Sequence, residues 1–187
     1  KPTESLTSGV APNVACPSSI GALPITDADD SRLQGSHLIV IMKSARRIMR
    51  YHQGKLFYAK GAPACWNMGL GPSPIGHKQR EGDGKTPEGW YRTSDKPWSQ
   101  WYAAIAIHYP NKTDATAAKL DGRIDGSTAK SIMADLNQGK KPSQTSALGG
   151  EILIHGGGSA SDWTLGCIAM DNPDIDALRA MLPPEKV

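Results

Sequence analysis

The sequence predicts a β-dominated domain, a sandwich or curled sheet of short strands with two short helices at its periphery. Three observations support this. Short apolar runs rich in β-branched residues recur between turn residues, which is typical of strands. Gly (20) and Pro (14) are both above average usage, which favours many turns over long helices. The strand-like runs outnumber the helix-like runs and connect through hairpin signals, as in layered β folds.

The chain has 187 residues, which fits one domain with a full-sized core. Residues 1–36 are rich in Pro, Ser, Gly, Asp and Thr without periodicity, so we expect an extended N-terminal arm, and the domain itself at 37–187. Trimming the first dozen residues should cost little stability. The chain starts at Lys1 rather than Met, so we expect that a signal peptide or another upstream piece was removed.

Charge and hydropathy exclude several classes of protein. The 21 Lys and Arg residues are scattered and exceed the 18 Asp and Glu residues by only three, whereas a nucleic-acid binder usually concentrates its basic residues. No apolar run approaches the roughly 20 residues that span a bilayer. We therefore expect a monomer without a membrane span, a nucleic-acid partner or a cofactor.

Cys16, Cys65 and Cys167 are the three cysteines. An odd number in an exported protein suggests one disulfide and one free thiol. We predict that Cys16 pairs with Cys65. The alternative is that both are buried free thiols in a reducing compartment.

The first half of the domain reads as a series of hairpins. The predicted strands are 37–42, 47–52, 55–59 and 63–70. Gln53-Gly54 is a two-residue hairpin signal. The β-branched residues of 37–42 predict that this strand is buried on both faces.

The second half mixes strands and helices. Residues 90–91 and 103–108 read as strands. Between 112 and 147 we predict one helix, 128–137, with Ser127 as N-cap and Gly139 past its end. A C-terminal helix follows, capped by Asn172. Its predicted details are Pro173 at its first position and an inward stripe of Ile175, Leu178 and Leu182.

A long loop rich in Gly and Pro covers 71–92. Loops of this length in compact domains are often functional. His77, Lys78 and Arg80 are candidates to face an anionic substrate. The alternative is that they are solvated turn residues.

The stretch 151–170 carries the chemistry. An apolar run, 152–154, ends at His155, and after eleven loop residues Cys167 opens a second apolar run. If these strands pair, the imidazole and the thiol lie side by side, as a thiol nucleophile and its base require. A core cysteine with a satisfied histidine is the plain alternative. A zinc site from His155, Cys167, His108 and Cys65 is a rival without supporting ligand spacing.

Neighbouring residues have predicted roles in such a site. The Gly156 carbonyl would hold the tautomer of the histidine, and backbone N–H groups around Leu165, Gly166 and Cys167 would form an oxyanion hole. Thr164 would orient the loop or donate a hydrogen bond. We expect Trp163 to pack under the loop or to stack on a sugar ring, and Trp98 and Trp101 to line a cleft.

Several segments together resemble the YkuD-type L,D-transpeptidase catalytic domain over about 37–182. The matching pieces are Gly54-Lys55 after the first strands, Pro74-x-Gly76-His77-Lys78, Gly82-Asp83-Gly84-Lys85-Thr86-Pro87-Glu88-Gly89-x-Tyr91, Tyr109-Pro110-Asn111 with Asp114, Ile154-His155-Gly156, and Asp162-Trp163-Thr164-x-Gly166-Cys167.

The resemblance implies a β-sandwich of mixed sheets, with Cys167 as nucleophile and His155 as base. The implied substrate is a peptidoglycan stem peptide, cut between the L-centre of a diamino acid and the terminal D-alanine. A thioester forms, and an amine of a second stem resolves it into a 3→3 cross-link. Tyr109, Trp163 and Thr164 join His77, Lys78 and Arg80 as candidate substrate-binding residues, and the implied location is the periplasm or cell envelope.

Two positions depart from the family pattern. Leu165 stands where the family often has a second histidine, and Ala169 where an Arg or Asn commonly follows. The ending Gly-Cys-x-Ala-Met also resembles members that hydrolyse peptidoglycan bonds. Three functions therefore stay open: an L,D-transpeptidase, a hydrolase that cuts with the same pair, and a non-catalytic wall-binding module.

Overall fold

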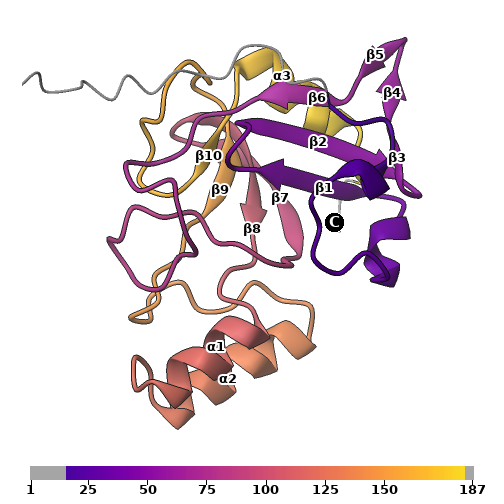
Figure 1. The fold of residues 1–187 in the computed structure, drawn as a ribbon. Helices are drawn as coiled ribbons and strands as arrows, with labels where there is room; N and C mark the ends of the chain where they lie inside the picture. The colour runs from indigo at the N-terminus through magenta and orange to yellow at the C-terminus, as the bar shows by residue number, and fades with distance from the viewer. Residues whose placement is uncertain (1–15, 184–187) are drawn as a thin grey trace, which may run out of the picture.

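The computed structural model describes residues 16–183, which form two four-stranded sheets. The first sheet is antiparallel and has β2 at its centre, paired with the other three strands. Its strands are β1 (Leu38–Met42), β2 (Arg47–His52), β3 (Lys55–Leu56) and β6 (Cys65–Asn67). This sheet lies across the upper part of the molecule in Figure 1.

The second sheet has the order β10-β9-β8-β7. Its strands are β7 (Thr93–Ser99), β8 (Tyr102–Ile107), β9 (Leu153–His155) and β10 (Ile168–Ala169). The pairs β7–β8 and β8–β9 are antiparallel, whereas β9–β10 is parallel, so the sheet is mixed. A separate small hairpin, β4 (Tyr58–Ala59) with β5 (Ala62–Pro63), projects from the first sheet (Figure 1).

Three α-helices flank the sheets. They are α1 (Lys112–Leu120), α2 (Gly126–Asn137) and α3 (Asn172–Ala180), besides the 3-10 turns η1 (Ile20–Ala22) and η2 (Ser31–Gln34). The first two pack on each other at the end of the molecule opposite the first sheet, and α3 packs on β8 (Figure 1). No helix within 16–183 has both the length and the apolar character that a membrane crossing needs.

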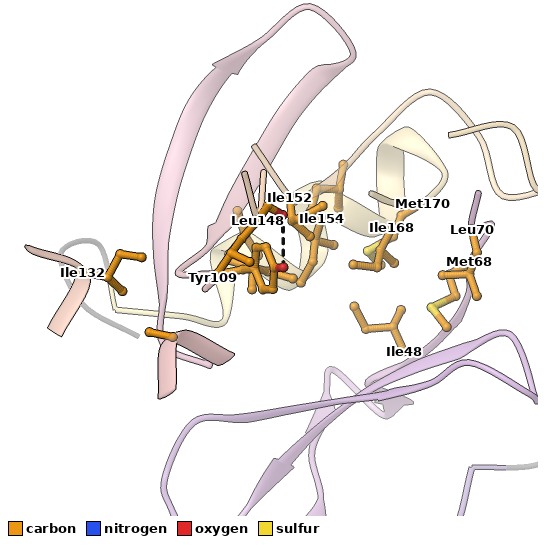
Figure 2. Packing of buried hydrophobic residues seen from close by; sticks show 14 of the residues in the cluster. Ile48, Met68, Leu70, Tyr109, Ile132, Leu148, Ile152, Ile154, Ile168 and Met170 are labelled. Atoms are coloured by element: carbon orange, nitrogen blue, oxygen red, sulfur yellow. Dashed lines mark hydrogen bonds between the residues drawn. The ribbon is translucent and has the colours of Figure 1, made fainter. Parts of the chain in front are cut away.

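The main hydrophobic core draws side chains from both sheets, which confirms the predicted sandwich. Figure 2 shows Ile48 of β2 and Met68, which directly follows β6, on one side of this core. Ile154 and Ile168 of the second sheet lie opposite them. Tyr109 lies in the same core and donates its hydroxyl to the Leu148 carbonyl, 3.1 Å away.

The strand buried along most of its length is β2 rather than β1. All five residues of β1 are only partly buried, because β1 pairs with β2 alone and forms an edge of its sheet. Alternate β1 side chains still pack on two different clusters. Ile39 and Ile41 meet the main core, whereas Leu38 and Val40 meet a second cluster. The prediction that both faces of this strand pack against other residues is therefore confirmed. The prediction that the strand is fully buried is wrong.

The second cluster attaches the N-terminal segment to the first sheet. Ile20, Leu23 and Leu33 pack there against Met49 and Tyr51. A disulfide between Cys16 and Cys65, as predicted, ties the start of this segment to β6. The predicted tolerance to trimming concerns the first dozen residues, which lie outside the described part of the chain.

The turn predictions met a mixed outcome. Gln53 and Gly54 connect β2 to β3 with φ angles of 48° and 75°, which confirms the two-residue hairpin. The predicted strand 55–59 is interrupted at Phe57, whose N–H donates to the Arg50 carbonyl instead of continuing the β3 ladder. The predicted strand 90–91 was wrong, because regular pairing begins only at Thr93.

The helix α1 was missed. Its sequence signal is a capping box, in which the Asn111 side chain accepts from the Asp114 N–H while Asp114 accepts from the Asn111 N–H. The buried face is made of small residues, Ala115 and Ala118, so its apolar pattern is faint. Local hydrogen bonding here outweighs a weak hydrophobic signal.

The two predicted helices form, but the N-cap residue of each lies before the predicted one in the sequence. Asp125 rather than Ser127 caps α2, because its carboxylate accepts from the Thr128 N–H. Asp171 rather than Asn172 occupies the N-cap position of α3, and the Asn172 side chain is used elsewhere.

Candidate active site

His155 ends β9, and Cys167 directly precedes the neighbouring parallel strand β10. His155 is the last residue of β9 and is in register with Ala169, while Ile154 is in register with Ile168. Successive side chains of a strand alternate between its faces. Ile154 and Ile168 point into the main core, so His155 and Cys167 lie on the opposite face. The pairing that the sequence required of these strands is present.

The thiol of Cys167 is half-buried against the start of β9. Its sulfur accepts from the Leu153 N–H at 3.4 Å, and its S–H donates to the Glu151 carbonyl at 3.3 Å. Burial raises the pKa of the Cys167 thiol above its ordinary value, and the Leu153 N–H opposes this rise only in part. The sulfur therefore rests as a neutral thiol.

The imidazole of His155 is held in one tautomer. Its Nδ1 lies 2.6 Å from the Gly156 carbonyl, which only accepts, so Nδ1 carries the hydrogen and Nε2 keeps the lone pair of the neutral ring. Burial lowers the pKa of His155, and the bond to Gly156 opposes this shift. Within 16–183 no hydrogen bond joins the imidazole to the thiol. The lowered pKa of His155 and the raised pKa of Cys167 both favour the neutral forms.

Two indoles surround His155. The Trp101 ring stacks on the imidazole with centroids 6.2 Å apart, and Trp163 meets it edge-on at 5.5 Å. The indoles also contact each other, 5.2 Å apart. The Trp163 Nε1–H donates to the Gly158 carbonyl, which fixes this indole to the loop. Packing by Trp163 was expected, but its contact with His155 was not.

The start of α3 anchors the loop that follows His155. The Asn172 side-chain carbonyl accepts from the Gly157 N–H at 2.8 Å. The Asp171 carboxylate accepts from both the N–H and the hydroxyl of Ser159. These bonds hold the glycine-rich loop at Gly157 and Ser159, so the Gly156 carbonyl keeps its position beside His155.

Asp162 ties the second half of the loop to the first sheet. One oxygen accepts from the Leu70 N–H at 2.8 Å and from Arg46 Nε at 3.0 Å, and the other accepts from Arg46 Nη2 at 2.6 Å. Burial alone would raise the pKa of Asp162, but the bonds from Arg46 and Leu70 outweigh it and lower the pKa. No local sequence signal points to this role of Arg46, because it lies 116 residues from Asp162.

Two hydrogen bonds and a close contact with the long segment 71–92 hold the backbone at Gly166 and Cys167. Thr86 donates its hydroxyl to the Gly166 carbonyl at 2.8 Å, and Thr164 donates to the Cys167 carbonyl at 2.8 Å. Gly166 has a φ of 130°, and a Cβ there would lie 2.8 Å from the Lys85 carbonyl. Only glycine fits this close approach without displacing the backbone.

Two of the candidate substrate-binding residues, His77 and Lys78, are engaged within the protein. His77 accepts from the Glu88 N–H at Nδ1 and donates from Nε2 to Asp114. The buried Lys78 ammonium donates to the Arg80 carbonyl and to Asp83. Both residues fold the long segment, which explains their presence without a ligand.

Tyr109 and Arg80 have opposite surroundings. Tyr109 is 1% exposed within the main core, so the expectation that it binds substrate is corrected. The Arg80 side chain is exposed, and its role stays a prediction. Among the remaining candidates, Thr164 is buried under the cysteine, whereas Leu165 is 85% exposed.

The residues of the zinc alternative are occupied elsewhere. Cys65 is bonded to Cys16, and the Nε2 atom of His108 lies 3.0 Å from the Ser94 hydroxyl. Over the described range 16–183, no three His, Cys, Asp or Glu side chains are grouped so that they could hold a metal ion.

Comparison with known proteins identifies the family of this chain. The YkuD model, described as the L,D-transpeptidase catalytic domain, matches residues 36–187. Two relatives, both named "Putative L,D-transpeptidase YafK", come from Escherichia coli strains K12 and O157:H7. Each is 30% identical over 168 residues, covering 86% of this chain and 53% of the relative. This chain thus spans about half the length of these relatives.

A solved structure, that of Bdellovibrio bacteriovorus Bd1075, aligns with a TM-score of 0.45 and 17% identity, over 82% of this chain and 46% of that one. The family assignment depends instead on the match over 36–187, which includes both strands of the site and the loop between them. This chain belongs to the YkuD family of L,D-transpeptidase catalytic domains.

Proposed function

We propose that this chain is a cysteine-dependent acyltransferase that acts on peptidoglycan stem peptides in the cell envelope. Cys167 is the nucleophile and His155 the general base. The observation that carries the proposal is their position on one face of the parallel pair β9–β10, with His155 at the end of β9 and Cys167 directly before β10, and with Nδ1 of His155 bonded to the Gly156 carbonyl. This bond leaves Nε2 as the nitrogen able to take a proton.

The first half-reaction starts from a neutral pair. The sulfur attacks the carbonyl carbon at the L-centre of the diamino acid, while Nε2 of His155 takes the thiol proton. The carbonyl oxygen becomes an oxyanion as the C–S bond forms. The C–N bond to the terminal D-alanine then breaks, and the imidazolium returns the proton to the leaving amine. A thioester on Cys167 and free D-alanine result.

Backbone N–H groups beside the thiol are suited to bind the oxyanion. The Gly166 N–H already donates to the Thr164 hydroxyl at 3.2 Å, so we do not assign this N–H to the oxyanion. Within 16–183 no acceptor is recorded for the N–H groups of Leu165 and Cys167. We assign the oxyanion to these two, because preorganised backbone donors stabilise developing charge most efficiently.

The second half-reaction defines the enzyme. As an L,D-transpeptidase, the enzyme passes the acyl group to an amine of a second stem and forms a 3→3 cross-link. As a hydrolase, it passes the group to water. Two positions favour the hydrolase as a second candidate function. Leu165 replaces a frequent second histidine with an exposed apolar side chain, and Ala169 is fully buried and offers no polar group to an acceptor.

Mass spectrometry of the products separates these outcomes. The protein is incubated with disaccharide-tetrapeptide, and Cys167→Ala serves as the inactive control. Cross-linked dimers support the transpeptidase, and tripeptide without dimers supports the hydrolase. If neither product appears and a carbapenem forms no covalent adduct, the proposed chemistry is wrong. Turnover by Cys167→Ala would remove the nucleophile assignment.

A further inference from the structure

Lys96 faces the same side of the second sheet as the proposed catalytic pair. It is in register with Ala104 of β8, which is in register with His155 of β9. Residues directly opposite one another across strands share a face. Adjacent strands lie about 4.8 Å apart, which places the Lys96 backbone about 10 Å from that of His155. A lysine stem reaches part of this distance.

A second lysine meets Lys96 at the carboxylate of Glu151. Lys96 Nζ and Lys141 Nζ each lie 3.5 Å from one oxygen of the Glu151 carboxylate. The carbonyl of this same Glu151 accepts from the Cys167 S–H. Two ammonium groups thus gather around the residue that contacts the sulfur.

These ion pairs are loose. Charge-assisted N–H···O bonds are usually about 2.7–2.9 Å long, and both contacts of Glu151 exceed that length. The Glu151 side chain is 58% exposed, so its pairs are weak and readily exchanged. Two lysines share one carboxylate, which leaves a net positive charge within the group.

The backbone of Glu151 is held in an unusual conformation. Its φ is 52°, in the left-handed region that side chains other than glycine seldom adopt. Its N–H donates to the Gln144 side-chain carbonyl at 2.8 Å, which stabilises this conformation. The strained residue places its carbonyl at the thiol and its carboxylate between the lysines. Strain of this kind concentrates at functional sites.

We propose that Lys96 and Lys141 form a carboxylate subsite for the C-terminal carboxylate of the stem peptide's leaving residue. This proposal rests on the proposed function. In such a stem, the carboxylate lies one residue beyond the attacked carbonyl, about 3.6 Å further along an extended chain. The subsite is therefore within reach of a peptide whose carbonyl contacts Cys167. Lys78 and His77, the earlier candidates, are already bonded to Asp83 and Asp114.

Glu151 then competes with the substrate. In the free protein its carboxylate occupies the position between the two ammonium groups, and a bound stem carboxylate replaces it. Neutralising Glu151 removes this competitor and adds one unit to the net positive charge. Glu151→Gln is expected to strengthen the binding of a free-acid stem, whereas a purely structural ion-pair role predicts no gain.

Binding to the Cys167→Ala protein tests the subsite without any chemistry. The probes are disaccharide-tetrapeptide and the same compound with a C-terminal amide, measured by calorimetry. We expect the free acid to bind about tenfold more tightly than the amide, the ratio that one charge-assisted hydrogen bond supplies. The double change Lys96→Met and Lys141→Met should remove this preference. Lys130→Met, an exposed lysine of α2, is the matched control and should keep it.

The opposite results overturn the subsite. They are equal binding of acid and amide by the Cys167→Ala parent, no binding of either, an unchanged preference after both lysine changes, or weaker acid binding after Glu151→Gln. Turnover of the tetrapeptide by the protein with Cys167 intact is a separate measurement. It tests the acyltransferase proposal, so a failure of the subsite can be told apart from a failure of the proposed function.

Discussion

The indole of Trp101 covers one face of the His155 imidazole, with ring planes 28° apart. Trp101 lies in the two-residue turn between β7 and β8, next to Tyr102. Tyr102 has a φ of 79°, and its hydroxyl donates to Asp176 of α3 at 2.6 Å. A strained turn anchored on α3 thus holds a ring beside the imidazole of the proposed base, which is itself 1% exposed.

Trp101→Ala should weaken this arrangement. An aromatic pair contributes about 0.5–1.5 kcal/mol, so we expect acylation to slow about two- to tenfold by the same free energy. Because water then reaches the imidazole, the pKa of His155 should rise toward its ordinary value. NMR titration of the His155 ring and the rate of carbapenem adduct formation measure the two effects.

Trp98→Ala is the control for this change, since Trp98 lies in the same hairpin and is 86% exposed. It should leave both the titration and the acylation rate as in the parent. Equal behaviour of the two variants would show that the stacking on His155 has no influence on the base.

His155→Ala should keep the fold and slow acylation by about a hundredfold or more, the usual contribution of a general base. His155 is buried, so near-ultraviolet circular dichroism should accompany the rate measurement. His108→Ala, at a histidine of the neighbouring strand end, serves for comparison and should retain most of the rate. Parent-like acylation by His155→Ala would remove the assignment of the base.

The neutral resting pair predicts a specific pH profile. The pKa of His155 is lowered by burial, so acylation should fall in acid with a midpoint below about 6.5. The pKa of Cys167 is raised by burial, so alkylation by iodoacetamide should increase only above about pH 8.5. Stopped assays of adduct formation and alkylation across pH 5–10 measure both.

A thiolate–imidazolium pair would give a different result. Alkylation would then be fast already near pH 6, and the thiolate would absorb in the ultraviolet at neutral pH. Either observation contradicts the neutral pair.

Asp162→Asn should destabilise the protein, because Arg46 and the Leu70 N–H lose an ionised acceptor. We expect a loss of about 2 kcal/mol in the free energy of unfolding near neutral pH, typical of hydrogen bonds to charged groups. The folded pKa of Asp162 is lowered, so its contribution is complete above the unfolded pKa of about 3.9. It is lost as pH falls through the lower folded pKa.

Urea unfolding at pH 7 and at pH 3 tests this dependence. The gap between parent and variant should narrow at the lower pH. Asp121→Asn, at an exposed pair with Arg123, should change little at either pH. A gap that widens in acid would contradict the role of the Asp162 charge.

The disulfide between Cys16 and Cys65 closes a loop of 49 residues. Replacing both cysteines with serine should lower stability by about 2–4 kcal/mol, because the unfolded chain regains the entropy of that loop. Alkylation of the denatured protein should label one thiol without reductant and three with it. Three labelled thiols without reductant would exclude the bond.

The sequence alone determined what local patterns encode. The apolar runs on either side of His155 and Cys167, the hairpin at Gln53-Gly54 and the inward stripe of α3 follow from side-chain periodicity and turn chemistry over a few residues. The family motifs then related the histidine to the cysteine. These features need no knowledge of distant contacts, and the structure retains them.

Only the tertiary structure decided which distant groups support the site. Arg46 meets Asp162 across 116 residues, Trp101 stacks on His155, and Lys96 joins Glu151 near the thiol. Such contacts depend on strand order and register, which bring residues together without any local sequence signal. For the same physical reason Tyr109 belongs to the core rather than to the site, because the packing of the whole sandwich sets its burial.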